Sequence, residues 1–366
     1  MKKTTFLSTL ALFALAACGS PTPSNQVLPQ EMIDEALSNP NKMLLNTVMA
    51  MATTPNMASE TNFETNGSFR QSTRETSSSS QSISTVLFSF DVDAQLLTND
   101  LLGSAPQAAL TLNINEFRTL MSSSFMGQSY TQDLSFEDQS IYALYDEGIA
   151  YLDLSNANEL LTSLTSGSLP TSKIKFPIQS PEELGLSPDE MTSEEQEAFI
   201  NEWLPFVDTI PGLEATVNGS TLDINYEITQ DDFNQMVRDM FLEGTENLTL
   251  TSEDEAFLNT LIEDTIEMVT IHTFSISLAL NLLTSQLTAL LVDVDVEMSD
   301  SFTYEMIVDY DPENPDADDE GWVWENTTIE TLTVIDVFAQ LSMETFSESR
   351  PIAILINKED FELVSL

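Results

Sequence analysis

The sequence predicts an α+β fold in which one large domain, residues 30–366, is built on a curved antiparallel sheet covered by helices. Three observations lead to this fold class. Several stretches alternate apolar and polar residues, which is typical of strands with one buried face. Other stretches place apolar residues at helical spacing behind capping residues. No interval of high polarity divides the chain after Pro29, although a domain boundary between residues 165 and 212 is the alternative.

Residues 1–17 have the organisation of an export signal peptide. Lys2 and Lys3 are followed by about ten apolar residues, Phe6–Leu15, which are too few to span a bilayer as a helix. The following Ala16-Ala17-Cys18 completes a pattern that resembles the bacterial lipobox. This resemblance implies cleavage before Cys18 and acylation of this cysteine, which is therefore the expected lipid-attachment residue. The alternative is an ordinary secretory signal with a chance cysteine.

Acylation of Cys18 predicts a lipid-anchored protein on the extracytoplasmic face of a cell membrane, with a Gram-positive cell surface as the expected setting. Acyl chains contribute roughly 0.8 kcal/mol per buried methylene and hold a soluble domain on a bilayer that it does not span. Residues 18–29 are rich in Pro and Ser and are expected to form a flexible tether. Because Cys18 is the only cysteine, no intramolecular disulfide is expected.

The chain is strongly acidic, with 60 Asp and Glu residues against 11 Lys and Arg residues and a formal net charge of −49. Such a charge repels phosphates, so nucleic acid is excluded as a partner. A well solvated surface explains the charge, and a surface for divalent cations or a basic partner is the second interpretation. With 42% hydrophobic residues, the chain has enough apolar side chains for a large core.

The first helix of the domain is expected to begin at Asn39-Pro40, where an N-cap residue precedes Pro at the first helical position. It continues to about Met51. Apolar residues, among them Met43, Val48 and Met49, cover more than half of its circumference. This distribution favours a buried helix over a surface helix.

Between Thr61 and Leu154 the apolar period changes to two. Val86, Phe88, Phe90 and Val92 share one face, whereas Ser89, Asp91 and Asp93 fall on the other. Residues 141–154 are predicted to form a hairpin that turns at Asp146-Glu147-Gly148, because Gly supplies the positive φ of a short loop.

The middle of the chain mixes loops, helices and one hairpin. Residues 163–192 contain four prolines and are expected to be an irregular connection. A helix capped by Thr192 or Ser193 follows, and then a type I′ hairpin at Asn218-Gly219. Two one-sided helices come next, the first capped around Thr229 and the second by a capping box of Ser252 and Glu255.

The last third returns to strands. Phe274, Ile276 and Leu278 share one face of the first strand. In the second strand, 292–298, Val and Met alternate with acidic residues. Two further strands, within 304–310 and 322–343, are joined by an acidic loop.

Catalysis is not expected from these residues. The single imidazole, His272, lies on a predicted strand as a core or rim side chain, so Ser or Cys nucleophiles have no base. Zinc sites need several His or Cys ligands. Paired carboxylates serve glycosidases, but sixty acidic residues make chance pairs certain and single out none. No catalytic residue and no cofactor are therefore assigned.

The acidic loop is the one candidate for metal binding. Asp309, Asp311, Glu313 and Glu320 stand at positions that carry oxygen ligands in a calcium-binding EF-hand loop. However, Asn314 replaces the expected Gly, and the flanking segments are predicted strands. A solvated hairpin loop is the alternative, and no metal site is assigned.

The order of elements is similar to that of Gram-positive lipoproteins of the LolA/LppX type. The similarity rests on the lipobox, the Pro-rich tether, the first helix, the alternating run 82–97, the hairpin Ile141–Tyr151, the capped helices and the paired strands 274–298. It implies a half-barrel of antiparallel strands that is covered by helices and encloses an apolar cavity for lipids or lipoproteins. It supplies no catalytic motif.

The leading hypothesis is a membrane-anchored, non-enzymatic, extracytoplasmic lipoprotein that binds or carries a lipid-like or other apolar ligand. The residues expected to line the ligand are Met43, Val48, Met49, Phe88, Phe90, Phe274, Ile276 and Leu278. The alternative is an acidic cell-envelope lipoprotein with a structural or interaction role that binds cations or a basic partner. A solute-binding transporter subunit ranks third, since the sequence lacks the alternation of a parallel α/β fold.

Overall fold

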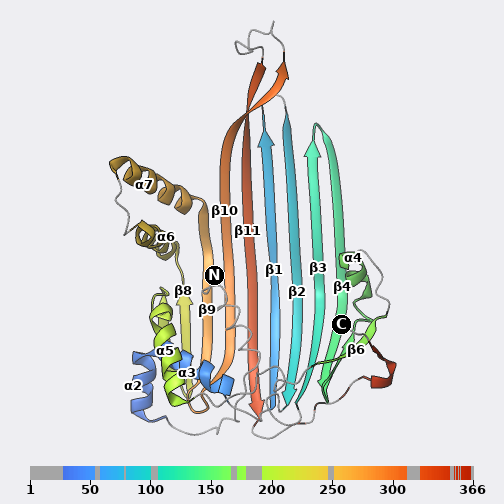
Figure 1. The fold of residues 1–366 in the computed structure, drawn as a ribbon, viewed down its shortest axis with the longest axis vertical. Coiled ribbons are helices and arrows are strands. Elements are labelled where there is room, and N and C mark those ends of the chain that lie inside the picture. Colours follow the sequence, from blue (N-terminus) through green and yellow to red (C-terminus); the bar gives the residue numbers. More distant parts are fainter. Residues whose placement is uncertain are drawn as a thin grey trace.

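The computed structural model describes residues 28–53, 58–77, 80–99, 106–165, 171–178, 192–245, 251–310, 322–346, 350, 352, 354 and 356–363. The signal peptide, Cys18, most of the tether and the acidic loop lie outside these residues. All twelve described strands belong to one sheet, in the order β12-β6-β5-β4-β3-β2-β1-β11-β10-β9-β8-β7. The sheet is open, because its two ends are different strands (Figure 1).

Six long strands make up the centre of the sheet (Figure 1). At about 3.3 Å per residue, a strand of 19 residues spans roughly 60 Å. Strands of this length are uncommon, since most strands in globular proteins have three to ten residues. The long strands are β1 (Ala58–Thr76), β2 (Gln81–Asn99), β3 (Gln107–Phe125), β4 (Gln128–Asp146), β10 (Gln286–Tyr310) and β11 (Trp322–Phe346).

Short strands extend the sheet on both sides. All neighbouring strands are antiparallel except β12 and β6, which are parallel. On the side of β4 lie β5 (Ile149–Asp153), β6 (Lys173–Pro177) and β12 (Glu362–Leu363). On the side of β10 lie β9 (Val269–Asn281), β8 (Thr221–Glu227) and β7 (Leu213–Asn218).

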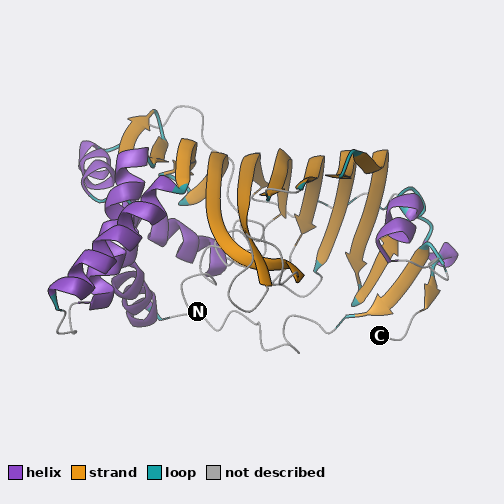
Figure 2. Ribbon diagram, turned by 90° about the horizontal axis from the view of Figure 1, so that it is seen from above, coloured by secondary structure: helices purple, strands orange, loops and turns teal. Residues whose placement is uncertain are grey.

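Most of the helices gather at one end of the sheet (Figure 2). Helices α2 and α3 contact β7 and β10, α5 packs on α3, and α6 and α7 lie beside β9. Only α4 lies near β4. The helices are α2 (Gln30–Ser38), α3 (Pro40–Thr53), α4 (Asn158–Thr165), α5 (Ser193–Val207), α6 (Gln230–Thr245) and α7 (Ser252–Glu267), with a 3-10 turn η1 (Lys358–Asp360).

The predicted fold class, an α+β half-barrel covered by helices, is wrong. The protein is mostly β, and the main contacts of the described helices are with β7, β9 and β10 on one side of the sheet and with β4 on the other. The alternating pattern correctly indicates an apolar face but contains no information about what covers it. The one-sided helices use part of their apolar surface on each other: Val237 of α6 packs with Ile262 and Ile266 of α7 in a small core of their own.

Several local predictions are confirmed. Helix α3 begins at Pro40, and Thr192 caps α5 in a capping box with Glu195. The hairpin β4–β5 turns at Glu147-Gly148, with φ values of 53° and 78°. In each case the signal is local, so it does not depend on how the rest of the chain packs.

Two local predictions are displaced by one residue. The hairpin β7–β8 forms, but its two-residue loop is Gly219-Ser220, and only Gly219 has a positive φ, 63°. This geometry is that of a type II′ turn, which takes Gly at its first central position. Helix α7 is capped by Thr251 with Asp254, so the capping box begins one residue before the predicted Ser252.

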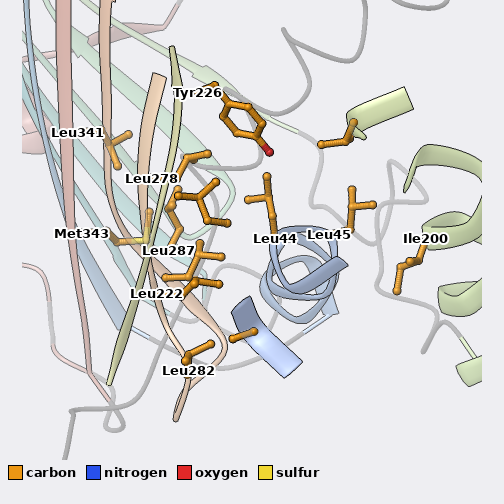
Figure 3. Packing of buried hydrophobic residues seen from close by; sticks show 14 of the residues in the cluster. Leu44, Leu45, Ile200, Leu222, Tyr226, Leu278, Leu282, Leu287, Leu341 and Met343 are labelled. Atoms are coloured by element: carbon orange, nitrogen blue, oxygen red, sulfur yellow. The ribbon is translucent and has the colours of Figure 1, made fainter. Parts of the chain in front are cut away.

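The main hydrophobic core lies between α2, α3 and α5 and the lower ends of β8–β11. Leu45, Leu222 and Leu280 are its most completely buried side chains. Figure 3 shows Leu44 of α3 directed at the strands, and Leu45 directed toward Ile200 of α5. Helix α3 is therefore a central layer between the sheet and α5.

A second, smaller core lies on the opposite face of the sheet, at the end formed by β2–β5. Ile352 and Phe361 of the C-terminal segment pack there against Ala109, Leu144 and Tyr151. The Tyr151 and Phe361 rings meet edge to face, 5.5 Å apart. The two cores thus leave the upper part of the sheet outside both.

Candidate functional site

The register of the long strands divides the sheet into two faces of opposite character. Residues opposite each other on paired strands point to the same side, and successive residues alternate between the sides. The side on which α3 packs, called here the helix face, contains Phe63 and Leu341 from the main core. Higher on the same side lie Phe69, Val86, Phe88, Phe90, Val92, Phe117, Leu134, Phe136, Val292, Val294, Val296, Ile335 and Val337.

The other side, called here the acidic face, has carboxylates at the same levels. It includes Glu64, Asp91, Asp93, Glu116, Glu137, Asp293, Asp295, Glu297 and Asp336. Some of these acids are direct cross-strand neighbours: Asp91 lies opposite Glu116, and Glu116 lies opposite Glu137. Like charges in such positions destabilise a sheet, so selection for strand stability alone does not account for this arrangement.

Aromatic side chains dominate the helix face on β2, β3 and β4. The Phe88 ring lies 5.7 Å from Phe90 and 5.0 Å from Phe117, and the Phe117 ring lies 6.2 Å from Phe136. We call these four residues the aromatic row. All four are only partly buried, and none of them belongs to the main core or packs against it.

Aliphatic side chains flank the aromatic row and are more exposed. Val86 is 37% exposed, Leu134 39% and Met121 46%. Contiguous exposed apolar surface of this kind is typical of binding sites for apolar ligands or partners. The aromatic row and its flanks are therefore the candidate functional site.

Paired bulges keep the aromatic row on one face. Asn115 of β3 and Asp138 of β4 are extra residues, and Asp138 has a positive φ of 53°. Each extra residue shifts the alternation by one, so Ile114 and Phe117 both point to the helix face. Asn115 donates hydrogen bonds to Asp93 (3.0 Å) and Asp91 (3.3 Å) on the other face.

The predicted lining residues do not converge on one cavity. Leu278 belongs to the main core, and Met43, Val48 and Ile276 pack against it, while Met49 is buried on α3. These side chains hold α3, the second described helix, on the sheet.

The remaining lining residues lie elsewhere. Phe88 and Phe90 are in the aromatic row, on a strand four positions along the sheet from β9. Phe274 borders a polar cavity of about 430 Å³ that also includes Gln230 and the exposed His272. Gln230 accepts a hydrogen bond from the backbone N–H of Ile271 at 2.7 Å, which fixes the bulge in β9.

Sequence reasoning missed Phe117, Phe136 and their flanking residues. The bulges at Asn115 and Asp138 interrupt the period of two, so strict alternation does not run through the whole of β3 or β4. The signal that identifies them is an alternation that changes phase by one residue at each bulge, so that Phe117 lies just after one bulge and Phe136 just before the other.

The acidic face has a shallow cavity of about 510 Å³ above β1, β2 and β3, bordered by Glu64, Asp91 and Asp93. Asn113 donates a hydrogen bond to Asp93 at 2.7 Å. Among the residues that the structure describes, no three His, Cys, Asp or Glu side chains are placed to hold a metal ion. Asp311, Glu313 and Glu320 of the predicted calcium loop lie outside those residues, so that hypothesis stays a prediction.

One ion pair stands out on the acidic face between β3 and β4. The Arg118 guanidinium donates two hydrogen bonds to the Asp133 carboxylate, at 3.0 and 2.8 Å. These bonds lower the pKa of Asp133 and raise the pKa of Arg118. The Arg118 charge is thereby matched to one acid, and Glu116 and Glu137 beside it remain anionic neighbours.

Within the described part of the chain, no helix is both long and apolar enough to cross a membrane.

No protein-family model and no curated protein matches the chain. Secretins are among the similar solved structures. The InvG secretin β-barrel of the Salmonella injectisome is 6% identical, with a TM-score of 0.16, and the alignment covers 83% of this chain and 66% of that chain. The Vibrio cholerae competence pilus secretin PilQ is 7% identical, with a TM-score of 0.17, over 81% and 62% of the two chains.

Proposed function

We propose that this protein is a membrane-anchored, non-enzymatic, extracytoplasmic lipoprotein that binds a lipid-like or other apolar ligand on the open part of its helix face. The observation that carries the proposal is the aromatic row, in which four Phe rings contact one another outside the main core. Burying such surface against an acyl chain is favourable by roughly 25 cal/mol per Å² of apolar area.

The chemistry of the two faces supports this assignment. A ligand with an apolar body gains its largest apolar contact on the helix face, because the acidic face places carboxylates between its apolar side chains at the same levels. The acyl chains expected on Cys18 keep the domain at a membrane surface, where lipid-like molecules are concentrated. The net charge of −49 holds the domain away from anionic headgroups.

The anchor is tested by mass spectrometry of the mature protein. We expect a membrane-bound chain that begins at an acylated Cys18, and we expect the Cys18→Ser variant to lose this modification. Recovery of unmodified Cys18 in a signal-bearing chain from the cytosol would contradict the proposal.

Ligand binding is tested with a fluorescent long-chain fatty acid and the Cys18→Ser chain, which carries no acyl group of its own. Phe88→Asn should weaken binding about tenfold, because roughly 1.5 kcal/mol of apolar contact is lost. Leu87→Asn on the acidic face of the same strand is the matched control. Equal losses in the two variants, or no saturable binding, would exclude the helix face as the site.

A second candidate function is the binding of divalent cations or a basic partner at the acidic face. The row Asp91–Glu116–Glu137 favours it, because nearby positive charge relieves the repulsion between direct cross-strand neighbours, although these three carboxylates are not placed to hold one metal ion together. Calorimetric titration with calcium, with and without Glu116→Gln, distinguishes this function from the binding of an apolar ligand.

A further inference from the structure

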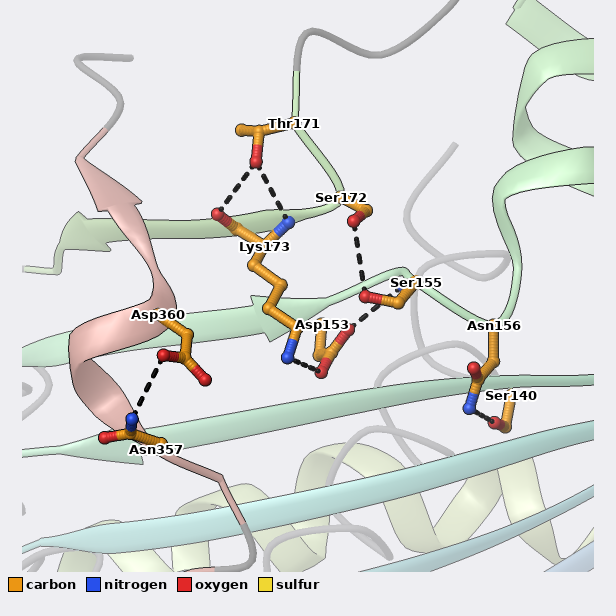
Figure 4. A network of polar contacts seen from close by, with 9 residues as sticks. All are labelled: Ser140, Asp153, Ser155, Asn156, Thr171, Ser172, Lys173, Asn357 and Asp360. Atoms are coloured by element: carbon orange, nitrogen blue, oxygen red, sulfur yellow. Dashed lines mark hydrogen bonds and ion pairs between the residues drawn. The ribbon is translucent and has the colours of Figure 1, made fainter.

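The outer edge of β4 has no strand partner over half of its length. β4 pairs with β3 from Gln128 to Asp146, but β5 covers only Tyr142–Asp146. Just above β5, Asn156 donates a hydrogen bond to the Ser140 hydroxyl at 3.1 Å (Figure 4), and α4 follows two residues later. Within the described residues, the stretch Gln128–Glu137 therefore forms an unpaired edge, called here the free edge (Figure 1).

The free edge lacks most of the devices that block strand addition. Every second residue of an edge strand directs its N–H and C=O away from the sheet, where another strand can bind them. The usual protections are short length, Pro or Lys. Here the edge QSYTQDLSFE contains neither Pro nor Lys. The strand at the opposite end of the sheet, β7, has only six residues.

The side chains of the free edge continue the two faces of the sheet. Tyr130, Leu134 and Phe136 lie on the helix face, opposite Ser123, Thr119 and Phe117 of β3. Tyr130 is 62% exposed.

Asp133 and Glu137 lie on the acidic side of the same edge, next to Arg118 and Glu116. An added strand would therefore place alternate side chains beside apolar and anionic neighbours.

We infer that the free edge of β4 is a docking site for an extended cationic amphipathic strand, in which apolar residues alternate with Lys or Arg. Backbone hydrogen bonds to β4 supply the attachment, and the alternation supplies the selectivity. The apolar side chains extend the helix face beyond Leu134 and Phe136. The basic side chains meet Glu137 and the neighbouring Glu116, which has no basic residue opposite it on β2 or β4.

Charge argues against a second copy of the chain as the occupant. Self-pairing of β4 would bring a partner with a net charge of −49 to an edge that already has Asp133 and Glu137. The inference is independent of the proposed apolar ligand, because it rests on the backbone and charges of the edge, whereas ligand binding rests on the aromatic row.

The test uses the Cys18→Ser chain and a labelled ten-residue peptide of alternating Val and Lys with blocked ends. We expect saturable binding by fluorescence anisotropy and slowed hydrogen exchange of residues 128–137. A peptide with methylated backbone nitrogens keeps the side chains and charge, but it should bind at least about tenfold more weakly because it cannot donate to β4. A peptide of the same composition in which all Val residues precede all Lys residues, called here the block peptide, should also bind weakly because it lacks the alternation.

Matched variants separate a specific site from general attraction to an acidic protein. Glu137→Gln should weaken peptide binding about threefold to tenfold, and the effect should diminish in high salt. Glu297→Gln removes the same charge from the acidic face of β10, five strands away, and should change binding less than about twofold.

Equal effects of the two variants, or equal binding of the methylated or block peptide, would overturn the inference. Concentration-dependent dimerisation that protects residues 128–137 without peptide would assign the edge to a second copy and would also overturn it. Loss of fatty-acid binding in Phe88→Asn with unchanged peptide binding is expected, since Phe88 lies on β2, two strands away from the free edge.

Discussion

The lower and upper parts of the sheet are built from the same strands but differ in what covers them. At the lower end, α3 and α5 cover the helix face, and Leu222 and Leu280 are 0% and 1% exposed. On β2 and β3, the same alternation places Phe88 and Phe117 on a part of the helix face that the main core does not include. An identical sequence pattern therefore produces a closed core in one region and an open apolar surface in the other.

This difference separates two sources of stability. The covered end is stabilised by burial and close packing of side chains, so removing one of these side chains leaves a cavity. The open part depends on strand hydrogen bonds and cross-strand pairs, which contribute roughly 0.2–1 kcal/mol each. Surface in the open part is thus available for binding without loss of the core.

The largest expected effect is the difference between Leu280→Ala and Phe88→Ala. Leu280→Ala should lower the free energy of unfolding by about 2–5 kcal/mol, because it leaves a cavity beneath α3. Phe88→Ala removes a larger side chain but should lower the free energy of unfolding by only about 1 kcal/mol, since the ring is already partly exposed to water. Guanidinium denaturation followed by circular dichroism measures both. Equal losses would mean that the aromatic row is as much a core as the helix-covered end.

The next effect concerns the polar link that holds α3 to the covered end. The Tyr226 hydroxyl of β8 donates a hydrogen bond to the Asn41 side chain, and Asn41 donates one to Asp208 at 2.7 Å. Burial, together with the nearby Asp208 charge, raises the pKa of Tyr226 to about 12. The unfolded chain loses this proton near pH 10 while the folded protein keeps it, so stability falls as pH rises from about 10 to 12.

We therefore expect Tyr226 to contribute roughly 2–3 kcal/mol of pH-dependent stability that disappears over this range. The Tyr226→Phe variant should be less stable at pH 8 but should lose less of its remaining stability by pH 12. Denaturation at several pH values provides the comparison. Parallel pH profiles for the two proteins would show that Tyr226 is not buried as the structure describes.

A third effect concerns the small core on the acidic face. Lys358 of the C-terminal segment forms an ion pair with the buried Asp146. Burial alone would raise the pKa of Asp146, but hydrogen bonds from Lys358 and Gln107 outweigh it, so the net pKa is lowered. The stabilisation is present above the ordinary pKa of an aspartate and is lost as pH falls through the lowered value.

Lys358→Met should leave Asp146 without its cation and destabilise this core by about 1–3 kcal/mol. Hydrogen exchange should increase in residues 142–153, whereas the helix-covered end should be unaffected. A uniform increase over the whole sheet would mean that the two cores unfold together.

Local signals in the sequence predicted the element boundaries better than the architecture. Pro40 and the Thr192 capping box located helix starts, and Glu147-Gly148 located a turn, because these signals act over a few residues. The layering depends on contacts far apart in the chain, such as that of α3 with β10. A local sequence pattern therefore does not predict which strand, β10 or β2, a helix will cover.

The candidate site was predicted only in part for the same reason. Phe88 and Phe90 were identified from strict alternation, but Phe117 follows the bulge at Asn115 and Phe136 precedes the bulge at Asp138, so neither keeps the alternation of its whole strand. Met43 and Ile276 were expected at the ligand and instead pack at the main core. Apolar periodicity identifies which side chains share a face, whereas their exposure depends on the distribution of helices.

The smallest expected effect tests whether the open part of the sheet tolerates its like charges for function. Glu116 lies between Asp91 and Glu137 on adjacent strands, so Glu116→Gln should stabilise the protein by about 0.2–1 kcal/mol in low salt. The gain should shrink in high salt, where the Debye length falls to about 3 Å at 1 M. Thermal denaturation at the two salt concentrations measures it. Destabilisation by Glu116→Gln would show that positive charge within the protein already compensates this carboxylate. The like charges of the acidic face would then no longer support a cationic partner.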